Sequence, residues 1–330
     1  VIDGESFDPV ALLALFFKRS LGLLSQISQK LTALMITCAT LERGILDVLS
    51  RMVECAQLKA DRIAIQSYEE SFYSYMLRQP REFWANDSVL FEYRKDGIRA
   101  MHLECNRRTT PIVAFVKEER YAFPEFDPAR QQEMDAAFLE IAQEACGESA
   151  VGSVFLIGDG FAQDWMKESL RYLCKGRRVF QGNNLFSKGA CCGMQERMLP
   201  GETGKAHVFL GNDKLKANVG MRLLRQGEES YYALLDAGEN WYEAEHRMEL
   251  YIQDGNELAL TITPLAGSGA AGGSRLVRIV LEGLPGNVSR LWARVFLKEE
   301  GCLSVEVKDL GFGEYRASSG RVWKEEIEIG

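Results

Sequence analysis

Few side chains in this sequence are spaced for catalysis or metal binding. The three histidines, His102, His207 and His246, lie far apart in the chain, and none has the spacing of a metal ligand pair. Cys191 and Cys192 are adjacent and could be redox-active, but a local structural role fits them better. No two of the eight cysteines form a C-x-x-C pair, so the sequence predicts neither a disulfide framework nor a metal site. This cysteine usage favours a reducing cytoplasm.

Two groups of charged residues could also do chemistry. Asp159 and Asp164 are paired carboxylates near a turn, but acid–base or metal chemistry needs more ligands than the sequence offers there. We therefore expect one of them to cap a helix. Basic residues cluster between positions 175 and 188 and could hold an anion or an acidic partner, although a solvated loop is the simpler interpretation.

The overall charge narrows the class of partner. The 330 residues include 39 Lys and Arg against 47 Asp and Glu, which gives a net charge of −8. Such a chain has no general attraction for nucleic acid or anionic lipid, so neither is expected as its main partner. A protein or peptide partner is a separate expectation, which belongs to the interaction function considered below. The apolar run at 10–17 is too short to span a bilayer, and it lacks the flanking residues of a signal peptide.

Strands and helices alternate over the first part of the chain, which is typical of an α/β domain. Asp8-Pro9 and Asp127-Pro128 each supply an N-cap acceptor followed by proline, and each predicts the start of a helix. The pattern predicts strands at 33–38, 63–65, 113–117 and 153–157, a β-hairpin at 89–104, and helices at 41–56, 69–77, 127–147, 163–174 and 185–198.

The pattern changes near residues 200–206 to short strands with period-2 alternation. Leu303, Val305 and Val307, for example, alternate with polar residues, so one face of that strand is expected to be solvated. Strands are predicted at 231–236, 258–263, 276–281, 291–297 and 303–307. The Gly-rich run at 266–274 lacks the Gly-Lys-Ser/Thr of a phosphate loop and is interpreted as a hairpin connection.

Several segments, in their order along the chain, resemble DnaK-type heat-shock chaperones, in which an actin-like ATPase domain precedes a peptide-binding β-sandwich. The same layout is close to an uncharacterised bacterial family. The segments that carry the resemblance are LMITC (34–38), IQSYEESFYSYML (65–77), NDSVLFEYRKDGIRAMHL (86–103), VFLIGDGF (154–161), NNLFSKGAC (183–191), HVFLG (207–211), LEGLP (281–285) and EEGCLSVEVKD (299–309).

The resemblance implies a fold class and domain boundaries. Residues 1–203 would form an incomplete α/β actin-like (ribonuclease H-like) ATPase-type domain, with a first-lobe part at 1–86 and a second-lobe part at 87–203. Residues 204–330 would form an all-β sandwich resembling the DnaK substrate-binding domain. The chain begins inside the first lobe, so the first phosphate loop of the family is expected upstream of Val1.

The departures from the family affect its phosphate-binding segments. Tyr93 stands where the phosphate hairpin has an aspartate, and Gly97 is the single glycine of that hairpin. Ser67 aligns with the glutamate of the E-P-T motif. In the adenosine motif Gly158 is present, but Asp159 replaces the second glycine. A carboxylate there adds a side chain where close backbone approach is needed, and it repels phosphate.

By resemblance, a vestigial nucleotide site is predicted at Gly158, Asp159, Gly160, Asn183 and Asn184. Backbone N–H groups of the glycine turn and of the following helix start would contact ATP there. No catalytic residue and no metal ligand are predicted.

Three functions remain open at this point. The favoured one is a non-catalytic interaction or scaffold protein, possibly chaperone-like, that has no cofactor and is not an enzyme. The first alternative is a nucleotide-binding ATPase whose phosphate-binding half lies upstream. The second is a peptide-binding module that acts through the β-sandwich, by adding an extended strand to it.

Overall fold

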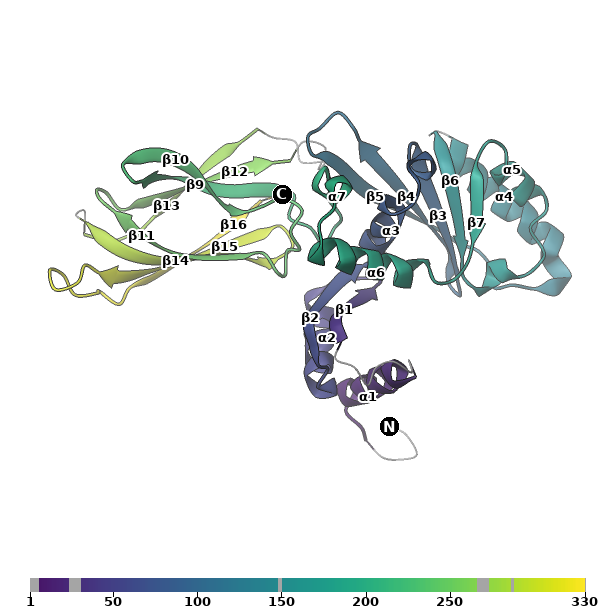
Figure 1. Cartoon of the computed structure of the whole chain (residues 1–330), viewed down its shortest axis with the longest axis horizontal. Helices are drawn as coiled ribbons and strands as arrows, with labels where there is room; N and C mark the ends of the chain where they lie inside the picture. Colours follow the sequence, from purple (N-terminus) through teal and green to yellow (C-terminus); the bar gives the residue numbers. More distant parts are fainter. Residues whose placement is uncertain (1–5, 24–30, 148–149, 266–272, 286–287, 330) are drawn as a thin grey trace. The chain divides into compact units, whose positions relative to one another are not determined.

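The chain forms two compact units in a computed structural model that describes residues 6–23, 31–147, 150–265, 273–285 and 288–329 (Figure 1). The first unit comprises residues 1–105 and 114–207, and the second comprises 106–113 and 208–330. The sequence pattern placed the boundary after residue 203, and it did not assign the segment 106–113 to the second unit. In the described residues, no helix is long and apolar enough to cross a membrane.

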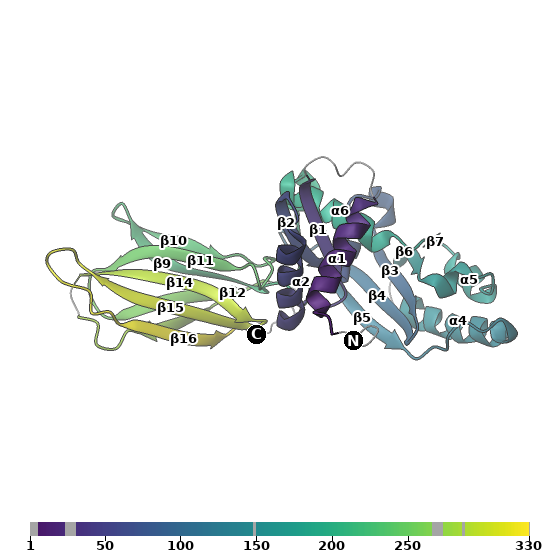
Figure 2. The ribbon, with the colours of Figure 1, turned by 90° about the horizontal axis from the view of Figure 1, so that it is seen from below.

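The N-terminal part of the first unit is a small α/β layer. Helices α1 (Pro9–Gly22) and α2 (Arg43–Ala56) lie side by side beside strands β1 (Leu31–Cys38) and β2 (Ala60–Ser67), which pair in parallel (Figure 2). The Asp8 carboxylate accepts a hydrogen bond from the Val10 backbone N–H at 3.0 Å, which confirms the predicted helix start. The buried core of this layer contains Val10, Ala14, Ile36, Met52 and Ala56.

The centre of the first unit is formed by strands β7, β6, β3, β4 and β5 of a six-stranded sheet in the order β7-β6-β3-β4-β5-β8, in which most of β8 is assigned to the second unit. The strands of this sheet are β3 (Asp87–Arg94), β4 (Gly97–Asn106), β5 (Ile112–Tyr121), β6 (Val151–Ile157), β7 (Arg178–Gln181) and β8 (His207–Phe209). Strand β3 runs antiparallel to β4 and parallel to β6, and β6 runs parallel to β7. The predicted β-hairpin is confirmed, with Arg94 paired to Gly97 at its end. The sequence did not predict β7.

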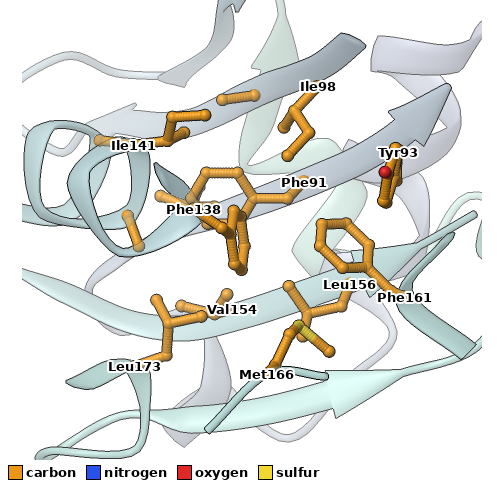
Figure 3. Packing of buried hydrophobic residues seen from close by; sticks show 14 of the residues in the cluster. Phe91, Tyr93, Ile98, Phe138, Ile141, Val154, Leu156, Phe161, Met166 and Leu173 are labelled. Atoms are coloured by element: carbon orange, nitrogen blue, oxygen red, sulfur yellow. The ribbon is translucent and has the colours of Figure 1, made fainter. Parts of the chain in front are cut away.

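Helices cover both faces of this sheet. The further helices of the unit are α3 (Tyr68–Leu77), α4 (Gln131–Gly147), α5 (Glu168–Leu173), α6 (Leu185–Met198) and α7 (Glu202–Lys205), with 3-10 turns at Arg81–Phe83, Pro128–Arg130 and Asp159–Ala162. Val154 and Leu156 of β6 pack in one buried cluster with Phe138 of α4 (Figure 3). Phe155 points to the other face and contacts the Phe72 ring of α3. The helix at 185–198 forms as predicted.

The helix predicted at 163–174 is wrong in its first part, because α5 begins only at Glu168. Asp135, which lies on α4, fixes this start. Its carboxylate accepts hydrogen bonds from the backbone N–H groups of Lys167, Glu168 and Ser169 at 3.1, 2.8 and 3.0 Å. Burial opposes ionisation of this carboxyl, but its hydrogen bonds from Ser169 and from the backbone hold the pKa below its usual value.

The second unit contains two antiparallel sheets of four strands, in the orders β10-β9-β12-β13 and β11-β14-β15-β16. Its strands are β9 (Ala217–Arg225), β10 (Glu228–Leu235), β11 (Glu245–Ile252), β12 (Glu257–Pro264), β13 (Arg275–Val280), β14 (Ser289–Glu299), β15 (Cys302–Gly311) and β16 (Val322–Glu328). All five predicted strands form, and Leu303, Val305 and Val307 are buried as their alternation indicates. Residues 266–272 of the predicted hairpin connection, like Val1, lie outside the described residues.

Candidate functional site

A cleft of about 590 Å³ in the first unit brings together four of the five predicted site residues. Gly158, Asp159, Gly160 and Asn183 line it, whereas Asn184 does not. Asn184 instead stands at the start of α6, where its carbonyl accepts the Lys188 N–H at 3.0 Å. The other lining residues are Tyr68, Glu92, Tyr93, Arg94, Lys95, Glu125, Phe126, Ile157 and Phe186.

The sheet explains why the glycine turn and Asn183 meet. The turn begins directly after β6, and Asn183 follows β7. Because β6 and β7 are parallel neighbours, their carboxyl ends lie at the same edge of the sheet. This is the edge at which open α/β sheets usually bind ligands, so the position of the cleft is a common one for a binding site.

The Asn183 side chain forms two hydrogen bonds with the turn. Its Oδ1 atom accepts a hydrogen bond from the Gly158 backbone N–H at 2.9 Å, and its Nδ2 atom donates to Asp159 Oδ1 at 3.1 Å. The N–H of Gly158 is therefore already bonded within the protein. A nucleotide phosphate that used this N–H group would have to displace the Asn183 amide.

Tyr93 accounts for both glycines of the turn. Gly158 has φ +104°, and a Cβ atom there would lie 2.3 Å from the Tyr93 carbonyl oxygen. A Cβ atom on Gly160 would lie 2.1 Å from a carbon of the Tyr93 ring. The ring is buried beside Phe161 at the end of the apolar cluster, as Figure 3 shows. The space beside the two glycines is therefore occupied by Tyr93, by its carbonyl at Gly158 and by its ring at Gly160.

The Tyr93 hydroxyl is fixed as a hydrogen-bond donor. It donates to the Pro124 carbonyl at 2.6 Å. Burial, and then the nearby Glu125 carboxylate, raise the pKa of Tyr93 to about 12. The hydroxyl is therefore protonated at neutral pH and cannot serve as a general base.

A buried ion-pair network lies beside the cleft and engages one of its carboxylates. Arg99, on β4, is 3% exposed, and its guanidinium contacts Glu92 at 2.6 and 2.8 Å. The same guanidinium lies 3.2 Å from Glu118 and 3.8 Å from Glu69 of α3. Glu92 is thus part of the structural framework of the unit. We call Arg99, Glu92, Glu118 and Glu69 the Arg99 network.

The remaining polar groups of the cleft do not form a metal site. In the parts of the chain that the structure describes, no three His, Cys, Asp or Glu side chains come together as ligands for a metal ion.

Ser67, which aligns with a family glutamate, is the N-cap of α3 and accepts the Glu70 N–H at 3.1 Å. Its hydroxyl therefore has a structural role.

Sequence reasoning missed an aromatic pair that lines the cleft. The rings of Tyr68 and Phe186 stack with centroids 4.1 Å apart and an interplanar angle of 10°. Tyr68 begins α3 and Phe186 lies in the first turn of α6, so the two rings are far apart in sequence. No local motif marks such a pair, because the contact depends on how the two helices pack.

Gly160→Ala should destabilise the first unit by about 1–3 kcal/mol, because the added methyl group meets the Tyr93 ring. Urea unfolding measures the effect. The cost should shrink in a Tyr93→Leu background, where the ring is absent. Gly44→Ala, in α2, is the matched control, since a Cβ atom there meets nothing within 4 Å. An equal cost with and without the ring would contradict the role given to Tyr93.

Two family models cover almost the whole chain. A model described as "Family of unknown function (DUF5716) C-terminal" matches residues 1–212, and one described as "Domain of unknown function (DUF8552)" matches residues 214–329. The division between them falls close to the boundary between the two compact units. A search of the curated proteins finds no match. Because the first model covers more than half of its residues, the chain belongs to the DUF5716 C-terminal family.

Proposed function

We propose that this protein is a non-catalytic interaction or scaffold protein, built on an actin-like and DnaK-like plan, whose nucleotide site is degraded. The observation that carries the proposal is the occupation of the glycine turn by the protein itself. The Tyr93 ring lies against Gly160, and the Asn183 amide holds the Gly158 N–H. A phosphate group would need the same space and the same donor.

The strand order supports the fold part of this proposal. Three successive strands, β3, β4 and β5, lie side by side, and β6 and then β7 are added in parallel on the free side of β3. Ribonuclease H-like lobes have this order, so it favours that assignment for residues 87–203. The small β1-β2 layer would correspond to part of the first lobe.

The electrostatics of the cleft support the loss of nucleotide binding. Asp159 places a carboxylate within the turn itself, where it would repel a polyphosphate. Arg94 and Lys95 line the same cleft, but Glu92 and Glu125 oppose them. A protein or peptide partner is proposed in place of a cofactor. A cytoplasmic location belongs to the same proposal, and the lack of a C-x-x-C pair or disulfide-framework spacing among the eight cysteines of the sequence supports it.

Titration of the full chain with Mg-ATP, by calorimetry and by thermal unfolding, tests the proposal. We expect no binding heat and no stabilisation at millimolar nucleotide. A ligand present at 100 times its Kd would stabilise the folded chain by about 2.7 kcal/mol, which a melting curve detects easily. Micromolar binding of ATP, or its hydrolysis, would overturn the proposal and favour the alternative of a nucleotide-binding ATPase.

A further inference from the structure

The second unit has a groove of about 360 Å³ between β13 and β16. These strands are the end strands of the two sheets, each hydrogen-bonded to a neighbour on one side only in the described residues. End strands present backbone N–H and C=O groups that another extended chain can bind. The groove therefore has the backbone groups that β-augmentation requires.

Side chains join the two sheets at both ends of the groove. Near one end, Arg321 and Trp323 donate hydrogen bonds to the Glu282 carbonyl at 2.9 and 3.1 Å. Near the other, Arg275 donates to the Glu328 carbonyl. Strand β13 is six residues long, from Arg275 to Val280. At about 3.3 Å per residue, a strand of this length can pair with an extended segment of about five residues.

The groove is lined by apolar side chains and by four charged residues, Arg278, Glu282, Lys324 and Glu325. Val277 and Ile279 line it from β13, and Trp323, Glu325 and Ile327 line it from β16. In the β15–β16 register, Glu325 is paired with Val305, which is buried in the core. Directly paired residues share a face of the sheet, so Glu325 faces the groove, between Trp323 and Ile327.

Glu325 differs from its neighbours on β16 in having no basic partner within the described residues. On the other face of the strand, Lys324 lies 2.6 Å from Glu306, and Glu326 lies 2.7 Å from Lys298. Glu325 is exposed to solvent. A chain that covered the groove would bury this carboxylate, at a cost of several kcal/mol unless it supplied a positive charge.

We propose that this groove binds an extended peptide of the pattern apolar–any–basic–any–apolar. The peptide adds to an edge strand, so alternate side chains face the groove. Its central Lys or Arg pairs with Glu325, and its two apolar side chains contact Trp323 and Ile327. This inference rests on the proposed interaction function and gives that function a surface and a class of partner.

Fluorescence anisotropy with the full chain and labelled five-residue cores tests the proposal. We expect Ile-Thr-Lys-Thr-Val to bind at least about tenfold more tightly than Ile-Thr-Glu-Thr-Val. Glu325→Lys should reverse this preference, since it reverses the charge that lies between Trp323 and Ile327 on the groove side of β16. Glu326→Gln is the matched control on the opposite face and should leave the preference unchanged. Unfolding curves check that each variant is folded, as expected for exposed positions.

Two results would overturn the inference. One is equal binding of the two peptides, or a preference that Glu325→Lys does not alter. The other is a dimer in sedimentation experiments that Glu325→Lys dissociates, because a second copy of the chain would then occupy the groove. The Mg-ATP titration is independent of both results, so failure of the degraded nucleotide site and failure of the groove are distinguishable.

Discussion

Asp309→Ala is expected to destabilise the second unit by about 3–5 kcal/mol. The Asp309 side chain is fully buried, and its carboxylate forms a bidentate ion pair with the Arg316 guanidinium, at distances of 2.9 and 3.1 Å. It also accepts the backbone N–H groups of Gly311 and Ser319 at 2.9 and 2.8 Å. Alanine would leave a largely buried guanidinium and two N–H groups without their acceptor. Urea unfolding, with amide hydrogen exchange in β15 and β16, measures the loss.

The Asp309 carboxylate also predicts that the stability of the second unit depends on pH. Burial opposes ionisation, but the Arg316 pair and the hydrogen bonds hold the pKa of Asp309 far below its usual range. The folded pKa is depressed, so its stabilisation is fully present above the unfolded value of about 3.9. It is lost as the pH falls from there towards the folded pKa. Asp309→Asn should flatten this loss. An alanine variant within about 1 kcal/mol of the parent would contradict the prediction.

Arg99→Leu is expected to destabilise the first unit by about 3–5 kcal/mol. Removing the buried cation of the Arg99 network leaves Glu92 and Glu118 close together, with only the more exposed Arg94 and Arg120 as counter-charges. The change also removes the 3.8 Å contact with Glu69 and so weakens the attachment of α3 to the sheet. Urea unfolding followed by far-UV circular dichroism measures the effect.

Arg120→Leu is the matched control for this change. Arg120 contacts the same Glu118 carboxylate at 2.6 Å, but its side chain is 71% exposed. Solvent screens such a pair, so its removal should have little effect on stability. Equal losses for the two variants would show that burial of the Arg99 network does not matter. The double variant Arg99→Leu/Glu92→Leu should lose less stability than Arg99→Leu alone. That result would support the role of the buried Arg99–Glu92 pair.

The parts of the fold that local sequence determines could be predicted. Asp8-Pro9 begins α1 because the capping side chain and the proline lie within the helix's own first turn. The start of α5 could not be predicted, because the acceptor for its N–H groups is Asp135, on another helix. Strand β7 was missed for a similar reason. It has four residues, and it is held by its parallel pairing with β6.

The candidate site was predictable to a similar degree. The turn at 158–160 and Asn183 were grouped by the family resemblance and not by the strand pattern, because β7, which precedes Asn183, was not predicted. The position of the Tyr93 ring could not be predicted. No sequence pattern indicates which neighbours a residue at the end of a hairpin contacts. The groove between β13 and β16 was also beyond sequence reasoning, since it depends on how two sheets meet along their edges.

The packing of Tyr93 against the glycine turn affects which residues are retained as this family evolves. Selection for folding alone is enough to retain Gly158 and Gly160, since a side chain at either position would collide with Tyr93. If the ancestor bound a nucleotide, as the proposed function supposes, a lineage that lost the nucleotide would still inherit these two glycines. Among relatives, the residue at position 93 is the more informative marker of an ancestral ATPase: an aspartate there would point to phosphate chemistry, and an aromatic ring to its replacement.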